Sequence, residues 1–455
     1  MPARHPRMAT VAVGLAVLAA LAACGNTSTT STTTGNTDGV SPNRIVVGGL
    51  ASQTGPLPAD FAPVLTGAQV YLDMVNHEGG VNGRTIQFAH KLDDQSSPSV
   101  DTSAARTLVD QYHVFAVVAV ATPSFAGATY LASHNVPTFG LNVNPNSQWL
   151  AGPSMFGNTG SFTDFGTPQQ QSAFLAEQRH VHAAAVLAYN VAASQQGCQG
   201  PLNAFHRYGI PVAFEDLSIP APATDLHADV TRMKALGVDM VVSCMDLSGN
   251  VLLSRTMQQA GISGITQLWF DGYDQSALGQ FGSSMDGVYF LLQHVPFEVT
   301  QLDPGVYPGM DLFQRTLRRY APGTSPSEAA LAGWTSAALF VRGLQAIGRD
   351  VSRSRLISAI NRISSFTADG ILAPVDWRVG HREVNGPTNC TAFVQVQGGH
   401  FVPVYGTPPS VFSCFAVPPA AGPPIQLVTP IPAGVPPLSR TAAAGGSAVT
   451  GPRPR

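Results

Sequence analysis

The sequence predicts an α/β protein of two lobes, each a mainly parallel sheet flanked by helices, with hinge crossovers between the lobes. Three observations support this architecture. About 370 residues lie between two polar ends, which is more than one hydrophobic core usually covers. Strand and helix patterns alternate along the chain, which is typical of parallel sheets. The alternation stops after residue 141 and restarts at residue 183, which indicates two blocks.

The first residues have the pattern of an export signal. Basic residues precede an apolar run, Val11–Ala23, that has the length of a signal-peptide core. The run ends in Leu21-Ala22-Ala23-Cys24-Gly25, and small residues before a cysteine resemble the lipobox of bacterial lipoproteins. The resemblance implies a signal peptide over residues 1–23 and lipidation of Cys24, which would anchor the protein outside the cytoplasm on the bacterial cell membrane. A plain secretory signal with a chance cysteine is the alternative.

Both ends of the mature chain have compositions that bury little apolar surface. Residues 24–42 are mostly Thr, Ser, Gly and Asn, which is typical of a flexible tether. Residues 416–455 are rich in Pro, Ala and Gly and lack hydrophobic periodicity, so we expect a disordered tail.

The first block begins with a strand and a long amphipathic helix. Apolar or small residues recur at helical spacing from Phe61 to Val75, and Gly79-Gly80 ends the helix. Val114–Val120 is apolar on both faces, as a buried parallel strand is. The other strands and helices expected here are Ile45–Gly48, Thr85–Ala89 and Pro137–Leu141, and Ser99–Tyr112 and Phe125–His134.

The second block repeats the alternation after a crossing over residues 142–166. Its expected strands are Ala183–Ala188, Pro211–Glu215, Asp239–Ser243, Gln267–Phe270 and Gly287–Leu292, and its helices are Pro201–Tyr208, Thr224–Leu236 and Val251–Ala260. Three helical patterns then precede three short strand-like runs: Met310–Tyr320, Ser327–Ile347 and Arg353–Ile363, then Val375–Trp377, Ala392–Val396 and Phe401–Tyr405. This order predicts a return to each lobe in turn, with several crossings that make a hinge. We therefore expect lobe 1 over 43–158 and 298–365, and lobe 2 over 159–297 and 366–415.

Composition argues against several classes of function. Charged residues make up only 11% of the chain and the net charge is −3, so no basic stripe suggests nucleic acid. His, Cys, Asp and Glu do not cluster at the spacing of metal ligands, and we expect no metal and no cofactor.

Four cysteines remain besides Cys24. Oxidising compartments favour pairing, and four cysteines allow three connectivities. We predict Cys198–Cys244, since both follow neighbouring strands, and Cys390–Cys414, which would close a hairpin-sized excursion. Four unpaired buried thiols are the alternative.

Four motifs follow one another behind the lipobox: Gly49–Leu57, Asn76–Arg84, Asp93–Ser96 and Phe270–Gly272. In order and spacing, from Asn43 to Tyr405, they resemble the type I periplasmic binding proteins of the branched-chain amino acid group. The resemblance implies a two-lobed clamp that binds its ligand in the cleft between the lobes. The membrane permease of an ABC transporter would then receive the solute. Ligands of parallel sheets lie outside the carboxyl ends of the strands, which agrees with this arrangement.

The resemblance also implies which residues contact the ligand. In amino-acid-binding relatives, hydroxyls and backbone N–H groups after strands three and four hold the ligand carboxylate. By position these map to Thr122, Ser124, Asn142 and Asn144, although Asn144 stands where relatives often carry a hydroxyl. An acid of the second lobe binds the ligand ammonium, and Asp271 matches it. Helix capping and an ordinary Asp-Gly turn are the alternatives.

Two further residues are candidates for the cleft. Asp246 falls near a position where relatives often place an aromatic. If it faces the cleft, the second acid favours a cationic or hydroxyl-rich solute, but we favour a cap of the following helix. Tyr189 follows the first strand of lobe 2 and either stacks on the ligand or packs there.

Together these observations predict a monomeric, extracytoplasmic solute-binding lipoprotein of an ABC importer. Its solute would be small and polar, such as an amino acid or a related compound. A ligand-sensing lipoprotein of the same fold without transport is one alternative, and an exported hydrolase is another. The sequence contains no Gly-x-Ser-x-Gly elbow and no His-Glu-x-x-His motif, so we do not expect an enzyme.

Overall fold

A computed structural model describes residues 36–56, 58–143, 147–160, 168–381, 390–406 and 408–416, together with Gly422, Ile425 and Leu427. The predicted signal peptide, the predicted lipidation site Cys24 and the candidate ligand residue Asn144 therefore lie outside the described residues.

The first sheet is parallel and has the strand order β2-β1-β3-β4-β5. Its strands are β1 (Arg44–Ala51), β2 (Thr85–Asp93), β3 (Ala116–Ala121), β4 (Thr138–Gly140) and β5 (Met155–Gly157). β3 is buried along its whole length, as its apolar sequence predicts, because helices cover both faces of the sheet. β5 lies in the segment that the sequence assigned to a crossing, and its three residues are too few for a clear pattern.

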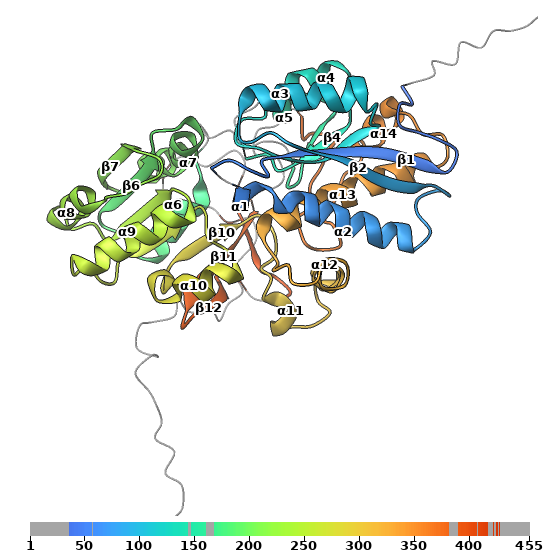
Figure 1. The fold of residues 1–455 in the computed structure, drawn as a ribbon. Helices are drawn as coiled ribbons and strands as arrows, with labels where there is room; N and C mark the ends of the chain where they lie inside the picture. The colour runs from blue at the N-terminus through green and yellow to red at the C-terminus, as the bar shows by residue number, and fades with distance from the viewer. Residues whose placement is uncertain are drawn as a thin grey trace, which may run out of the picture. The chain divides into compact units, whose positions relative to one another are not determined.

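Two groups of helices cover the first sheet (Figure 1). One face packs against α3 (Pro98–Arg106), α4 (Ala128–Ser133) and α5 (Ser147–Ala151), and a short π-helix, η1 (Thr107–Gln111), extends α3. The other face packs against α2 (Pro63–His77), α12 (Pro308–Tyr320), α13 (Glu328–Ile347) and α14 (Arg353–Ile360). A four-residue helix, α1 (Pro58–Phe61), precedes α2, and Phe61 is buried in the core.

Close contact between α2 and α13 joins segments that are far apart in the sequence. Gly67 lies on α2 where a Cβ atom would overlap the carbonyl of Ala330, and Gly333 on α13 meets the carbonyl of Val64 in the same way. Glycine is needed at both positions because the two backbones touch there. This packing brings the residues after 308 back onto the first sheet.

The second sheet has the order β12-β11-β10-β9-β8-β6-β7, and β13 also pairs with β11. Its strands are β6 (Ala184–Tyr189), β7 (Val212–Ile219), β8 (Met240–Cys244), β9 (Thr266–Trp269), β10 (Tyr289–Leu292), β11 (Cys390–Gln397), β12 (His400–Val404) and β13 (Phe412–Cys414). Strands β6 to β10 are parallel, whereas β11 runs antiparallel to β10, β12 and β13. The second sheet is therefore mixed, and the predicted two-lobed α/β fold is confirmed.

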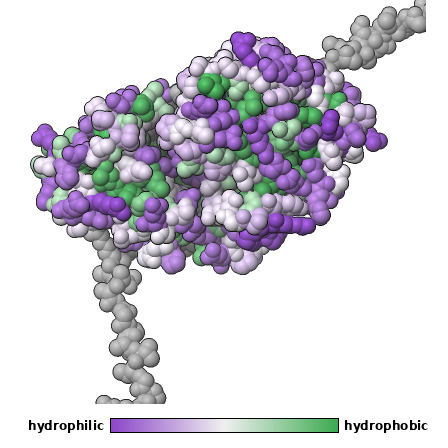
Figure 2. All heavy atoms as spheres, in the orientation of Figure 1, coloured by the Kyte–Doolittle hydropathy of each residue, from purple (hydrophilic) through white to green (hydrophobic). Residues whose placement is uncertain are grey.

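Helices also cover both faces of the second sheet. One face packs against α6 (Gln170–Gln178) and α7 (Ala192–Tyr208), and the other against α8 (His227–Ala235) and α9 (Leu247–Gln259). The helices α10 (Gln275–Met285) and α11 (Val299–Leu302) follow β9 and β10. On the face that Figure 2 shows, hydrophobic residues form separate patches among hydrophilic ones, as is usual for a surface exposed to water.

Two local predictions are wrong. The helix expected from Pro201 begins at Ala192 and continues through Pro201, although a proline inside a helix removes one backbone hydrogen bond. The strand expected at Val375–Trp377 is reduced to an isolated bridge between Val375 and Phe366.

Both predicted disulfides are present. Cys198 on α7 bonds to Cys244 at the end of β8, and Cys390 on β11 bonds to its cross-strand partner Cys414 on β13. Beyond these bonds, Leu427 forms a bridge with Phe415, and Ile425 is buried against the second sheet. Part of the segment predicted to be a tail from residue 416 onward thus contacts the fold.

Candidate ligand-binding site

The candidate site lies at the carboxyl ends of the strands, where loops of a parallel sheet gather. In the first lobe, β3 leads into Thr122 and Ser124. Thr122 is fully buried and hydrogen-bonds to the carboxyl group of Asp101, so it lies within the lobe beneath its loop. Ser124 is partly exposed, and its hydroxyl oxygen is buried without a hydrogen-bond partner among the described residues. Of these two hydroxyls, Ser124 is the better placed to bind a solute.

Asn142 follows β4 and holds the chain where it leaves the first sheet. Its Nδ2 atom donates to the carbonyl of Gly160 at 3.2 Å, and its Oδ1 atom accepts from the hydroxyl of Thr159 at 3.4 Å. An amide has two donors and two acceptor sites, so part of its capacity is used within the protein. The structure therefore gives Asn142 a positioning role at the start of the crossing.

In the second lobe, Tyr189 and Asp246 end neighbouring strands and bond to each other. The hydroxyl of Tyr189 donates to Oδ1 of Asp246 at 2.5 Å. The same carboxylate accepts from the backbone N–H of Gly249 at 3.0 Å and caps α9. The favoured interpretation of Asp246 as a cap is confirmed. The ring of Tyr189 is buried in the apolar core of the second lobe, which favours the packing alternative over stacking on a ligand.

Asp271 meets the same helix end. Its Oδ2 atom accepts from the backbone N–H of Leu247, the first residue of α9, at 2.9 Å. The side-chain amide of Asn250 donates to the Asp271 carbonyl at 3.1 Å and so fixes its backbone. The first turn of a helix carries unsatisfied N–H groups and a partial positive charge, which suits both acids. Asp246 and Asp271 are thus held by one helix, yet each keeps some solvent exposure.

Carboxylates of the first lobe approach those of the second. Burial raises the pKa of Asp271 to about 8, and the charges of Asp60, Glu328 and Asp246 add to this effect. Burial and the charge of Asp246 raise the pKa of Asp60 to about 6. Asp60 belongs to α1 and Glu328 begins α13, so carboxylates of the first lobe lie within electrostatic range of Asp271 in the second. Such a group of carboxylates attracts a cation.

Apolar side chains accompany these acids. Val143, Val191 and Phe270 follow β4, β6 and β9, and they are 45%, 44% and 38% exposed. They are three of the five large hydrophobic residues that are exposed among the described residues. Ligand sites combine apolar walls with a few polar groups, so the strand ends have the composition of such a site.

The sequence places Asp60 beside the cleft-facing start of the first helix, but it selects neither Asp60 nor Glu328 as a ligand residue. The only local feature that marks either residue is its place at the start of a helix. Asp60 follows Pro58 in α1, and Glu328 follows the cap Ser327 of α13. Their approach to Asp271 depends on tertiary structure, because Asp60 lies 211 positions before it and Glu328 lies 57 positions after it. Only a three-dimensional contact could have identified them.

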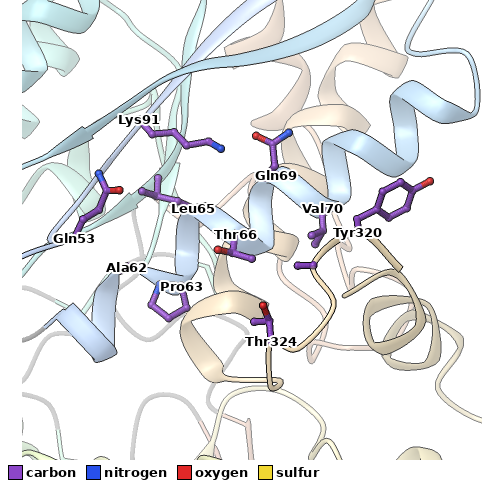
Figure 3. A pocket seen from close by; sticks show the side chains of 11 residues that line it. Gln53, Ala62, Pro63, Leu65, Thr66, Gln69, Val70, Lys91, Tyr320 and Thr324 are labelled. Carbon is purple, nitrogen blue, oxygen red and sulfur yellow. The ribbon is translucent and has the colours of Figure 1, made fainter. Parts of the chain in front are cut away.

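A separate pocket lies within the first lobe (Figure 3). It has a volume of about 520 Å³ and is bordered by α2, the end of β2 and the loop after α12. Lys91 reaches over it from β2, and burial lowers the pKa of this ammonium group. The lining is otherwise uncharged, with Gln53, Gln69 and Thr324 among its polar members. None of the predicted ligand residues lines this pocket.

The described part of the chain contains neither a group of metal ligands nor a helix that could span a membrane. No three His, Cys, Asp or Glu side chains in this part of the chain are grouped so that they could hold a metal ion. No helix within it is long and apolar enough to cross a membrane.

Two α/β lobes whose strand ends face each other define a class of protein that binds small solutes between its sheets. The family model of periplasmic binding proteins matches residues 44–400, and the chain belongs to this family. The expected family is thereby confirmed. A search of curated proteins finds no significant match.

Solved structures share the fold at low sequence identity. LivJ of Streptococcus pneumoniae, a branched-chain amino acid transporter substrate-binding protein in complex with isoleucine, is 18% identical, with a TM-score of 0.63 over 79% of this chain and 98% of LivJ. The fatty acid ABC transporter substrate-binding protein of Thermomonospora curvata is 16% identical, with a TM-score of 0.65 over 81% and 93%. A solute-binding protein of R. palustris in complex with benzoate is 19% identical, with a TM-score of 0.63 over 79% and 95%. These similarities establish the fold.

Proposed function

We propose that this chain is the solute-binding lipoprotein of an ABC importer and that it captures a small solute carrying an amine. The observation that carries the proposal is the convergence of Asp60, Asp246, Asp271 and Glu328 between the two sheets. The charges that shift the pKa of Asp271 most are all carboxylates, so a cation bound there would relieve their repulsion. An ammonium group satisfies this need and forms charge-assisted hydrogen bonds.

The remaining groups suit the rest of an amino-acid-like molecule. The Ser124 hydroxyl can donate to a carboxylate, and Val143, Val191 and Phe270 can contact an apolar side chain. The relatives with solved structures include one that holds isoleucine and one that holds benzoate, which has no amine. The carboxylate cluster favours the amine-bearing class for this chain. Thr122, Asn142, Tyr189 and Asn144 would support the site around these contacts.

A thermal-shift screen of the mature chain tests the solute class. The library would contain neutral and basic amino acids, diamines, fatty acids and aromatic acids. A ligand that binds only the folded state raises its stability by about 2.7 kcal/mol at a hundredfold excess over its dissociation constant. We expect amines to raise the melting temperature and amine-free acids to leave it unchanged.

The variant Asp271→Asn tests the carboxylate. We expect it to remove most of the shift, while Asp303→Asn, at an exposed aspartate outside the site, keeps it. If an amine-free solute gives the largest shift and Asp271→Asn leaves that shift intact, the amine assignment is wrong and a solute-binding function remains.

Membrane attachment and transport need separate tests. Cys24→Ser should prevent fatty-acid incorporation and move the protein from the membrane fraction to the soluble fraction. Deletion of the gene should reduce uptake of the labelled solute, and the wild-type gene should restore uptake. Unchanged uptake would favour the sensing alternative over transport.

A further inference from the structure

Two buried carboxyl groups meet beneath the loops of the first sheet. Asp94 follows β2 and Asp101 lies on α3, and neither has any exposed surface. Their side chains are within hydrogen-bonding range of each other. This contact is unusual, because two adjacent buried carboxylates cannot both be ionised without strong repulsion.

One oxygen of each carboxyl group is committed to neighbouring loops. Oδ1 of Asp94 accepts from the hydroxyl of Ser52 at 2.5 Å and from the backbone N–H of Ser96 at 3.0 Å. Oδ1 of Asp101 accepts from the backbone N–H of Gly127 at 2.5 Å. The pair therefore connects the loop after β1, the turn after β2 and the loop that leads from β3 into α4.

The second oxygen of each group accepts from no backbone N–H, and Thr122 is the side chain whose hydroxyl bonds to the Asp101 carboxyl group. Oδ2 of Asp94 and Oδ2 of Asp101 are both buried and have no hydrogen-bond partner within the described structure. A buried acceptor without a donor is costly, and a proton held between the two oxygens would satisfy both. We propose that Asp94 and Asp101 share one proton and that this protonated pair positions the loops carrying Ser52, Ser96 and Ser124.

The surroundings of Asp101 favour the proton. Burial is the largest effect on this group and Asp94 adds to it, which together raise the pKa of Asp101 to about 7. Hydrogen bonds from Gly127, which precedes α4, and from Thr122 after β3 act in the opposite direction. Several elements pack around Asp101 in the described structure. Asp94 is the residue on them whose charge acts on Asp101. Within the described residues, no cation is among the groups that act on Asp101.

Loss of the proton would change the first half of the binding site. Two buried anions would repel each other and loosen the three loops that they join. The loop from Thr122 to Gly127 includes Ser124, so its order would depend on pH. The relevance to solute binding rests on the proposed function, whereas the shared proton itself does not.

The stability of the folded state should depend on pH because of this proton. An unfolded aspartate has a pKa of 3.8 and folded Asp101 one of about 7, so the folded state binds more protons between these values. Stability must then fall as pH rises from about 4 to about 7, with no further change from this group above that range. An ordinary surface aspartate, whose pKa does not change on folding, contributes no such slope.

The test compares melting temperatures of the ligand-free mature chain from pH 4.5 to pH 8.5. Asp101→Asn can accept from Gly127 and donate to Asp94, so it imitates the protonated pair at every pH. We expect the melting temperature of Asp101→Asn relative to the wild type to rise from pH 4.5 to about pH 7 and to stay level above that value. Asp94→Asn tests the same proton from the other side, should Asp101→Asn fail to fold. Asp101→Ala should melt lower at both pH values, because Gly127 loses its acceptor.

Hydrogen exchange gives a second readout. After correction for the intrinsic pH dependence of exchange, the peptide covering residues 122–127 should exchange faster at pH 8 than at pH 5.5 in the wild type. Asp101→Asn should remove this difference, and the control Asp303→Asn should keep it. A melting-temperature difference between Asp101→Asn and the wild type that stays constant from pH 4.5 to pH 8.5 would overturn the proposal. No ligand enters this test, so its outcome is independent of the screen for solutes.

Discussion

The hydroxyl of Tyr189 donates a 2.5 Å hydrogen bond to Oδ1 of Asp246, across the ends of two neighbouring strands of the second sheet. Burial and this carboxylate raise the pKa of Tyr189 above its ordinary value, so the phenol stays protonated and remains a donor. The bond also aligns Asp246 to cap α9. One tyrosine thus supports both a strand end and a helix start at the candidate site.

Removal of this hydroxyl should destabilise the protein. Tyr189→Phe leaves the ring in place but deprives Asp246 of a donor, and a hydrogen bond to a charged group contributes about 1.5–3 kcal/mol. We expect chemical denaturation to show a loss of that order. Tyr112→Phe is the matched control, because Tyr112 is 40% exposed and should change stability by less than about 0.5 kcal/mol. Equal losses in the two variants would argue against the role given to Tyr189.

Binding of an amine should release a proton from Asp271. Its pKa of about 8 in the free protein means that the group is mostly protonated at pH 7, whereas an ammonium ligand requires the ionised form. Affinity should therefore rise as pH increases toward 8, by up to about tenfold per pH unit, and level off above that value. Isothermal titration calorimetry in buffers of different ionisation enthalpy measures the released proton directly.

Asp271→Asn should remove this pH dependence together with at least about 30-fold of affinity, since loss of one partner of a desolvated charge pair costs about 2–5 kcal/mol. If ligand binding to Asp271→Asn releases as many protons as binding to the wild type, another group of the cluster is the one that titrates. Asp60→Asn would then be the variant to measure.

The contact between α2 and α13 should not tolerate a side chain at Gly67. A Cβ atom there would overlap the carbonyl of Ala330, so the helices must separate. We expect Gly67→Ala to destabilise the protein by about 1–3 kcal/mol in chemical denaturation, as overpacking usually does. Gly279→Ala on α10 has open space around it and should instead stabilise by up to about 1 kcal/mol. A neutral Gly67→Ala would show that the two helices can move apart freely.

The Cys198–Cys244 disulfide should contribute substantially to stability. Its residues are 46 positions apart, and closing a loop of that length in the unfolded chain corresponds to about 4 kcal/mol in the chain-entropy model. The double variant Cys198→Ser/Cys244→Ser should lose a comparable amount in oxidising buffer. Cys390→Ser/Cys414→Ser, with a separation of 24, should lose slightly less. Both cysteines of the first pair are at least 92% buried, so mild reductant should act only after unfolding.

Local patterns in the sequence determined the two blocks of alternating strands and helices, because burial on one or both faces imposes a period on neighbouring residues. The apolar run that becomes β3 and the stripe from Phe61 to Val75 are examples. The pairing of four cysteines and the family motifs also came from the sequence. Asp271 was selected by its motif position, and the structure places it among other acids, although its contact with a ligand remains a prediction.

Tertiary structure alone decided which charges meet. Asp60 and Glu328 have no pattern that connects them to Asp271, and the packing of α13 on α2 through two glycines is what places Glu328 in the same lobe as Asp60. Asp94 follows a strand and Asp101 belongs to a helix in the sequence, yet the fold buries their carboxyl groups together beneath the loops of the first sheet. Periodicity reports burial along one element, whereas a site depends on electrostatic contact between elements that the whole fold brings together.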